Sequence, residues 1–136
     1  MITGFELLLG HMVGDYLLQN KWMAFNKSNY SAVGWLSCVA HCLLYTLSVC
    51  VATSHWSVEW VILVFLSHFI LDKFEVVELY LKLIKGRSIK VYLNYYTDSK
   101  YSPEICIQAG FTSLVYAAAD NTAHLLLMWV CYKYII

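Results

Sequence analysis

Charged side chains are scarce in this chain of 136 residues. Asp, Glu, Lys and Arg make up 13% of it, whereas soluble domains usually carry about 25%. Hydrophobic residues make up 60%, and this imbalance predicts an integral membrane protein. The nine basic and nine acidic residues cancel to a formal charge of zero. The sequence therefore offers no basic surface for nucleic acid, and none is expected as a partner.

Cysteine is present in an odd number and proline is almost absent. The five cysteines lie mostly in apolar runs, which argues against a disulfide framework and predicts buried free thiols. The single proline, Pro103, separates two apolar segments. The N-terminal apolar segment lacks a basic start and carries Glu6, His11 and Asp15, so it is not expected to be a cleaved signal peptide.

Four helical segments fit the hydrophobic pattern, and no strand pattern does, so the predicted fold is all-α. Thr3 and Glu6 have the spacing of a capping box at the start of the first segment. The third segment is apolar as far as Leu71 and then alternates charged with apolar residues, which predicts an amphipathic extension. The expected fold is one integral membrane domain, residues 1–136, forming a four-transmembrane-helix bundle. Its predicted helices cover about residues 3–20, 32–54, 58–85 and 103–134.

Lysine and arginine in the connections predict the orientation of these helices. The first connection holds Lys21 and Lys27, and the third holds Arg87 and Lys90, whereas residues 54–57 hold no basic residue. Basic connections stay on the cytoplasmic side of a membrane. The first and third connections are therefore expected in the cytoplasm, and both termini on the outer side.

Seven ionisable side chains lie inside these apolar segments. Three of the four helices carry a histidine and an aspartate four residues apart, a spacing that puts both on one helix face. The second helix carries one histidine. The seven candidates are His11, Asp15, His41, His68, Asp72, Asp120 and His124.

The depths of these groups in the predicted helices agree. His11 lies eight residues before Gln19, and His41 lies nine residues after Ala32. At about 1.5 Å per residue, each is roughly 12–13 Å from the cytoplasmic end of its helix. Gly10 and Gly14 would let a neighbouring helix approach beside His11. All seven side chains are thus expected to converge in the bundle centre, displaced toward the cytoplasm.

A divalent metal is the first explanation for such a cluster. A lone charge at bilayer depth is costly, and imidazole and carboxylate groups are metal ligands. Seven candidates exceed the ligands of one closed zinc site, so two metals, or one metal with supporting aspartates, both fit. Zinc is the first candidate, and manganese, iron and magnesium are the others. Asp15, Asp72 and Asp120 would be ligands, orienting groups or a catalytic base. A hydrogen-bonded packing cluster and a proton or ion relay remain as alternatives.

Four sequence motifs resemble an uncharacterised family of small phage and bacterial membrane proteins, designated domain of unknown function 3307. The motifs are GHMVGDYLLQNKWMAFNKS, AHCLLYT, SHFILDKFE and DNTAH, which contain His11 and Asp15, His41 and Tyr45, His68 and Asp72, and Asp120 and His124. The last motif departs from the family pattern, because Asn121 stands where glutamine is expected. The resemblance covers nearly the whole chain. It implies a phage or prophage setting, and therefore the inner membrane of a bacterial host, but no established activity.

The leading functional hypothesis is a metal-dependent hydrolase that acts at the cytoplasmic side of the membrane. This label is an analogy with other small membrane families that carry His/Asp motifs. The expected partners are the lipid bilayer and a lipid-linked or membrane-proximal substrate, and an oligomer is left open. The alternative is a non-enzymatic ion or proton conductor, or a phage membrane effector that alters the host envelope.

Overall fold

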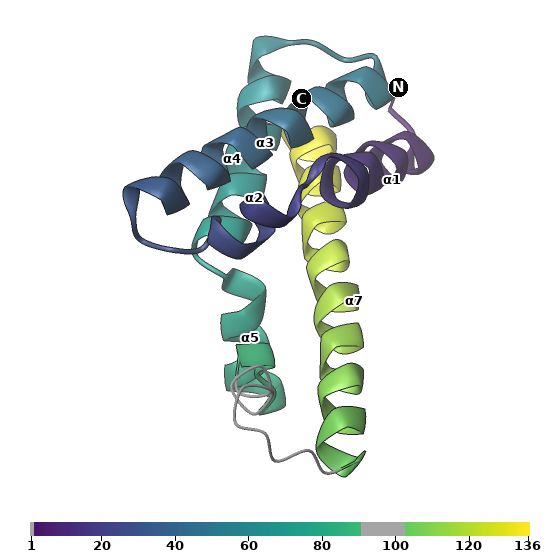
Figure 1. Ribbon diagram of the computed structural model, residues 1–136. Coiled ribbons are helices and arrows are strands. Elements are labelled where there is room, and N and C mark those ends of the chain that lie inside the picture. The colour runs from purple at the N-terminus through teal and green to yellow at the C-terminus, as the bar shows by residue number, and fades with distance from the viewer. Residues whose placement is uncertain (1, 91–102) are drawn as a thin grey trace. The chain divides into compact units, whose positions relative to one another are not determined.

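The computed structural model of the chain describes residues 2–90 and 103–136. Its elements are helical, and no strand occurs within those residues, as the sequence predicts. In chain order they are α1 (Gly4–Met12), the π-helix η1 (Val13–Leu18), α2 (Lys21–Asn26), α3 (Ala32–Thr53), α4 (Val58–Lys73), α5 (Val76–Lys85) and α7 (Pro103–Tyr134) (Figure 1).

Polar side chains directly before the helices fix where these begin. The predicted capping box is present, because the Glu6 amide donates to Thr3 Oγ1 at 3.3 Å and the Thr3 amide donates to Glu6 Oε2 at 2.6 Å. At α2, α3 and α4 the side chains of Asn20, Ser31 and Ser57 each accept one hydrogen bond from an amide of the first turn. These caps satisfy amide groups that the first helical turn leaves without partners.

The described residues form two compact units, and α7 contributes to both. The first unit consists of Met1–Glu75 with Ala123–Ile136, and the second is Val76–Thr122. In the second unit, α5 buries Val77 and Leu81 and exposes Lys82. The amphipathic pattern predicted for this stretch is therefore present in α5.

Helix α4 ends before the predicted third helix does. Glu75 has a φ angle of +48°, in the left-handed region that non-glycine residues rarely adopt. The α-helical hydrogen bonding cannot continue through this residue. The structure therefore replaces the single helix predicted over residues 58–85 with α4 and α5.

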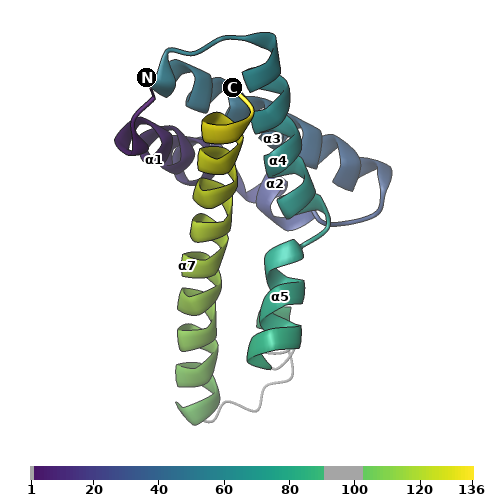
Figure 2. The same cartoon turned by 180° about the vertical axis from the view of Figure 1, so that it is seen from behind.

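In the first unit, α1, η1 and α2 pack against α3, and α3 packs against α4. Views from opposite sides show α1 beside α3 (Figures 1 and 2). A Cβ atom added at Gly10 would lie 2.8 Å from Val49 Cα, and one at Gly14 would lie 2.7 Å from Tyr45 Cδ2. The two glycines thus allow the close helix contact that the sequence predicts. The buried apolar core comprises Leu7, Tyr45, Val49, Cys50, Trp60, Val64, Met128 and Cys131.

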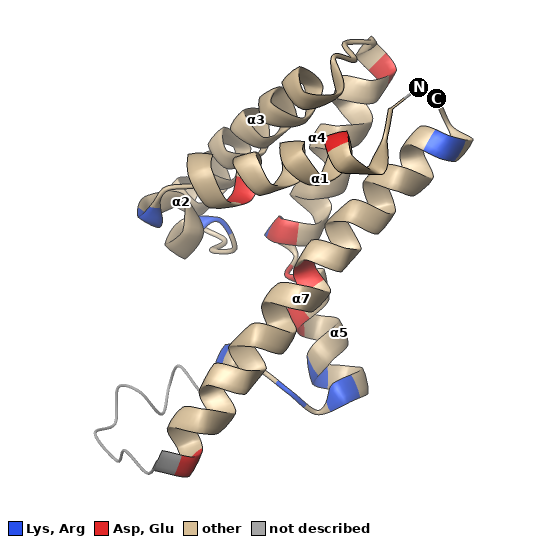
Figure 3. Ribbon diagram, turned by 90° about the vertical axis from the view of Figure 1, so that its right-hand side faces the viewer, with Lys and Arg blue, Asp and Glu red and all other residues tan. Residues whose placement is uncertain are grey.

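Helix α3 exposes large apolar side chains and buries polar ones beside the apolar core residues Tyr45 and Val49. Leu36, Leu43 and Val51 are 58–63% exposed, while Ser37 and His41 are fully buried. Its ribbon carries no charged position (Figure 3). A helix at the surface of a soluble protein turns a polar face outward, whereas the outward face of α3 is apolar.

Two helices among the described residues are long and apolar enough to cross a membrane, namely Ala32–Thr53 and Glu104–Tyr134. The predicted four-helix span is therefore not confirmed. Helix α1 has nine residues and α4 has sixteen, fewer than the roughly 20 that a spanning helix needs. The first helical stretch continues through η1 and ends at the extended residue Gln19, and α4 ends at Lys73, just before the break at Glu75.

Candidate metal centre

Each of four helical segments in the first unit directs two side chains, four residues apart, toward one centre. This spacing puts both members of a pair on the same helix face. All four histidines of the centre are at most 2% exposed. The pairs are His11 and Asp15 from α1 and η1, His41 and Tyr45 from α3, His68 and Asp72 from α4, and His124 and Met128 from α7.

The middle of this centre is the contact between His41 and His68, whose Nε2 atoms lie 2.9 Å apart. Two carboxylate oxygens flank the two nitrogens. Asp15 Oδ1 lies 3.3 Å from His41 Nε2 and 3.4 Å from His68 Nε2. Asp72 Oδ2 lies 3.2 and 3.3 Å from the same two atoms. Four atoms that commonly bind metals therefore come together from η1, α3 and α4.

The other ring nitrogen of His68 contacts a third histidine. His68 Nδ1 lies 3.0 Å from His124 Nδ1, and Asp72 Oδ1 lies 3.5 Å from His124 Nε2. A neutral imidazole carries one N–H group. His68 can therefore donate a hydrogen bond to only one of the two histidine nitrogens that it contacts.

Tyr45 fixes the ring of His68 from one face. The two rings stack with their centroids 3.5 Å apart and their planes at 15°. The Tyr45 hydroxyl donates to Met128 Sδ at 3.3 Å and lies 3.0 Å from His11 Nδ1. That nitrogen is also 3.4 Å from Asp15 Oδ2. Tyr45 thus positions His68 directly and Asp15 through His11.

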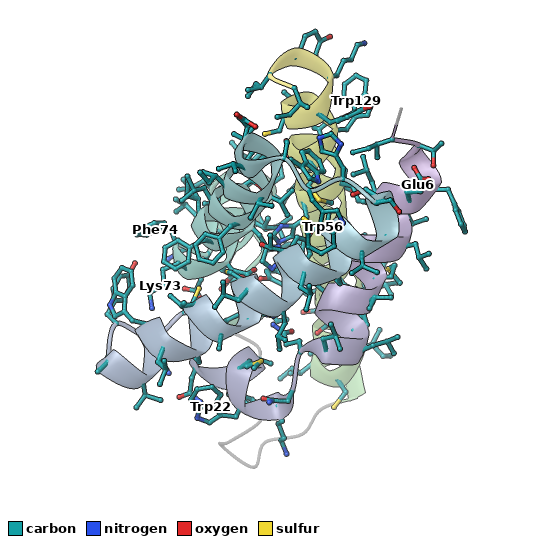
Figure 4. The ribbon with its side chains drawn as sticks, turned by 90° about the horizontal axis from the view of Figure 1, so that it is seen from above. Glu6, Trp22, Trp56, Lys73, Phe74 and Trp129 are labelled. Atoms are coloured by element: carbon teal, nitrogen blue, oxygen red, sulfur yellow. The ribbon has the colours of Figure 1, made fainter. Side chains whose placement is uncertain are left out.

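Two lysines adjoin the cluster. Lys27 Nζ lies 2.7 Å from Asp72 Oδ2. Lys73 is fully buried at the end of α4 (Figure 4); its Nζ donates to the carbonyl oxygens of Lys27 at 3.2 Å and Asn29 at 2.6 Å. The same ammonium lies 4.4 Å from the centroid of the Trp35 ring, a cation–π distance. Lys73 therefore holds the backbone segment from which Lys27 reaches Asp72.

The donor atoms fit a divalent metal. Two sets of three residues in the first unit offer ligand atoms within 4.8 Å of one another, and both contain His68. Ligands bound to one metal at about 2.0–2.2 Å lie about 2.9–3.5 Å apart, which matches the distances among His41, His68 and Asp72. Asp15 Oδ1 is buried and has no hydrogen-bond donor among the described residues, a lack that a nearby cation would correct. The two sets are His41, His68 and Asp72, and Asp15, His68 and His124.

Six of the seven predicted site residues lie in the first unit. His11 belongs to neither of these two sets, and its Nδ1 contacts Asp15 and Tyr45 instead. Asp120 belongs to the second unit, where it is partly buried one turn before His124 on α7. Its predicted role stays a prediction. The six residues of the first unit are His11, Asp15, His41, His68, Asp72 and His124.

Sequence reasoning did not assign site roles to Tyr45, Met128, Lys27 and Lys73. Tyr45 and Met128 follow His41 and His124 by four residues, the same spacing as the His/Asp pairs, and this regularity could have pointed to them. Lys73 directly follows Asp72 in an apolar helix, where an ammonium needs partners. No sequence pattern could have predicted a site role for Lys27, because its contact with Asp72 joins distant parts of the chain.

Comparison with known proteins identifies the family of this chain, but the function of that family is unknown. No curated protein and no solved structure is significantly similar to this chain. The profile of the family described as "Protein of unknown function (DUF3307)" matches residues 4–136, nearly the full length. The motifs around the four histidines already indicated this family. The chain therefore belongs to the DUF3307 family of proteins of unknown function.

Proposed function

We propose that this chain is an integral membrane protein with a metal-dependent hydrolase centre. The observation that carries the proposal is the set of His41 Nε2, His68 Nε2 and Asp72 Oδ2, mutually 2.9–3.3 Å apart. Catalytic zinc sites use three protein ligands and leave one position open. Zinc is the first candidate for the metal, with manganese, iron and magnesium as the others. Asp15 lies beside these three residues, but the metal would not need it as a ligand.

Four residues divide the chemistry among them. When bound, a divalent metal activates water and polarises a phosphoryl or acyl oxygen. His41, His68 and Asp72 would hold the metal. Asp15 Oδ1, within 3.4 Å of both imidazole nitrogens, takes the proton of the attacking water as general base. Its side chain is 13% exposed as a whole, while Oδ1 itself is buried, so the attacking water would lie inside the centre.

Lys27 adds a positive charge at the exposed edge of this centre. Its side chain is 21% exposed and ends 2.7 Å from Asp72. An ammonium in this position stabilises negative charge that develops on a phosphoryl or acyl oxygen. The substrate class that fits is therefore a phosphate or carboxylic ester, lipid-linked or close to the membrane surface.

Membrane insertion is supported by the outward apolar face of α3 and by two helices of spanning length. Hydrogen bonding between the Ile2 amide and Tyr132 Oη at 2.8 Å joins the two ends of the first unit. This contact supports both termini being on one side, which the basic connections assign to the outer side of a bacterial inner membrane. A phage or prophage protein in its host fits this location.

Proton conduction is a second candidate function, because His41, His68 and His124 form a chain of nitrogen contacts. The two contacts measure 2.9 and 3.0 Å, which suits imidazole-to-imidazole hydrogen bonds. Chains of histidine and aspartate carry protons in membrane transporters. A protein of this kind would conduct protons in liposomes without bound metal, and His68→Gln would abolish the flux.

The hydrolase proposal is tested on the full chain purified into lipid nanodiscs. Metal content is measured by mass spectrometry, and hydrolysis is assayed with p-nitrophenyl phosphate, bis(p-nitrophenyl) phosphate and p-nitrophenyl acetate. We expect at least one tightly bound divalent ion, and hydrolysis that stops on chelation and returns on reloading. Asp15→Asn should keep this ion and lose turnover, whereas the exposed control Glu59→Gln should keep both. Less than about half an equivalent of metal after loading would rule the proposal out.

A further inference from the structure

His68 is the one histidine shared by the two sets of metal-binding residues in the first unit. Its ring is 1% exposed, and each of its nitrogens faces the nitrogen of another histidine. His41 Nε2 lies 2.9 Å from Nε2, and His124 Nδ1 lies 3.0 Å from Nδ1. Two nitrogens bound to one metal at about 2.0–2.1 Å are separated by a similar distance.

We propose that the centre binds two divalent cations, one at each ring nitrogen of His68, which bridges them as an imidazolate. This inference rests on the proposed metal centre and extends it. The first cation takes His41, His68 Nε2 and Asp72. The second takes His68 Nδ1 and His124 Nδ1, while the Asp15 carboxylate, within 4.8 Å of ligand atoms of both histidines, stays unligated as the general base.

The orientation of His124 suits this assignment. Its Nε2 lies 3.5 Å from Asp72 Oδ1, so the carboxylate would favour a ring proton on Nε2 by charge attraction. The Nδ1 lone pair then points toward His68 Nδ1. Carboxylates commonly fix the tautomer of a metal-binding histidine in this way. Asp72 thus serves the first cation through Oδ2 and the second through His124.

The His68 ring cannot turn away from either neighbour. Tyr45 stacks on one face at 3.5 Å between ring centroids, and the centroid of the His124 ring lies 4.2 Å from that of His68, with the planes tilted by 35°. A rigid ring with a ligand partner at both nitrogens is suited to joining two ions. When the second cation binds, the remaining N–H bond of His68 breaks, its proton goes to solvent, and a nitrogen–metal bond forms.

The charges favour an anionic substrate. Asp15, Asp72 and the imidazolate supply three negative charges against four from the two cations, and Lys27 adds one more positive charge at Asp72. The surplus positive charge attracts an anion into the site. Among the ester substrates of the proposed hydrolase, the dinuclear centre therefore selects phosphate esters over neutral carboxylic esters.

The test is metal stoichiometry on the full chain in nanodiscs after loading with Zn²⁺ and removal of the excess. We expect about two ions per chain in the wild type and about one in His124→Gln. The control His55→Gln, which removes an imidazole outside both sets, should keep two. One ion in the wild type overturns the bridge and leaves the hydrolase proposal standing. No ion overturns both.

Copper loading provides a test that needs no variant. An imidazolate bridge pairs the electron spins of two Cu²⁺ ions, so the paramagnetic resonance signal should account for well under half of the bound copper at low temperature. In His124→Gln, one uncoupled ion should give its full signal. Two ions with full, uncoupled signals in the wild type would overturn the bridge even if the stoichiometry were correct.

Discussion

At the residue scale, Lys73 and Lys27 place two positively charged ammonium groups next to the proposed metal centre, and each has partners that offset its charge or its burial. Lys73 is fully buried, and its Nζ is satisfied by two backbone carbonyls and the Trp35 ring. Lys27 is partly exposed and touches the Asp72 oxygen that would bind metal. One lysine is therefore structural, and the other competes with the cation.

Removing the Lys73 ammonium should destabilise the fold. Lys73→Met keeps a side chain of similar length but leaves the carbonyls of Lys27 and Asn29 without their donor. Unsatisfied buried acceptors cost about 1–3 kcal/mol each, so the thermal midpoint in detergent should fall clearly. The control Lys133→Met removes an exposed ammonium that lies 4.6 Å from the Trp129 ring centroid and should change the midpoint little. Equal midpoints for the two variants would contradict the structural role.

Removing the Lys27 charge should strengthen metal binding. In Lys27→Gln, Asp72 Oδ2 keeps its negative charge but loses an ammonium 2.7 Å away, so less repulsion opposes the incoming cation. We expect Zn²⁺ to bind about tenfold more tightly in competition with a chelator, while turnover falls. Lys21→Gln, which alters an exposed lysine on α2, is the matched control. Weaker binding in Lys27→Gln would show that this lysine supports the metal site and does not compete with the cation.

At the element scale, close contacts of helices and loops determine where the site residues lie. The π-helix η1 carries Asp15, and its wider turn keeps Oδ2 of that residue 3.4 Å from His11. Such π-helical turns often occur at functional sites. Gly34 on α3 presses against the Asn29 carbonyl that accepts from Lys73. The start of α3 is thereby joined to the loop that carries Lys27.

Adding one methyl group at Gly34 should disturb this junction. A Cβ atom there would lie 1.9 Å from Asn29 O and 2.7 Å from Asn29 C, so the backbone must shift and the bond from Lys73 must lengthen. Overpacking of this kind costs about 1–3 kcal/mol. We expect Gly34→Ala to lower the thermal midpoint and to weaken Zn²⁺ binding.

The matched control for this prediction is Gly110→Ala on α7, where nothing lies within 4 Å of an added Cβ. Alanine there should raise helix stability by about 0.5–1 kcal/mol, because glycine loses more backbone freedom on folding. Stability changes of the same sign in both variants would show that the contact with Asn29 is not tight.

At the scale of the whole molecule, the first unit buries its histidines and Asp72 beside a small apolar core and exposes many other large apolar side chains. In water this arrangement would expose a large apolar surface, which soluble monomers avoid. In lipid the same surface is fully solvated, and the histidines and aspartates are shielded from the hydrocarbon. The distribution therefore favours a bilayer around the unit.

The proposed orientation can be measured with a membrane-impermeant maleimide. In a Cys106→Ser background, a cysteine replacing Trp56 should be labelled in intact bacterial cells, because the connection after α3 is proposed to face outward. A cysteine replacing Lys85 should be labelled only after lysis, because the C-terminal end of α5 is proposed to face the cytoplasm. Both positions are exposed. Labelling of the Lys85 site in intact cells would overturn the orientation.

The parts of the fold that follow from local pattern could be predicted. The capping box at Thr3 and Glu6, the close contact at Gly10 and Gly14, and the all-helical class depend on neighbouring residues and helical period. The break at Glu75 could not be predicted in this way, because the charged and apolar alternation runs through it unchanged. Length alone also overstated the spans, since the helical stretch of α1 and η1 ends at Leu18 and α4 ends at Lys73.

The sequence by itself determined which chemistry is present, because the His/Asp pairs at four-residue spacing can only line single helix faces. It also determined that these faces would be buried, because charges in apolar helices need partners. Only the tertiary structure decided which of the atoms meet. His41 and His68 are brought together by the packing of α3 on α4, and Lys27 reaches Asp72 across 45 positions in sequence. Contacts of that kind depend on the angles and registers between helices, which no local pattern specifies.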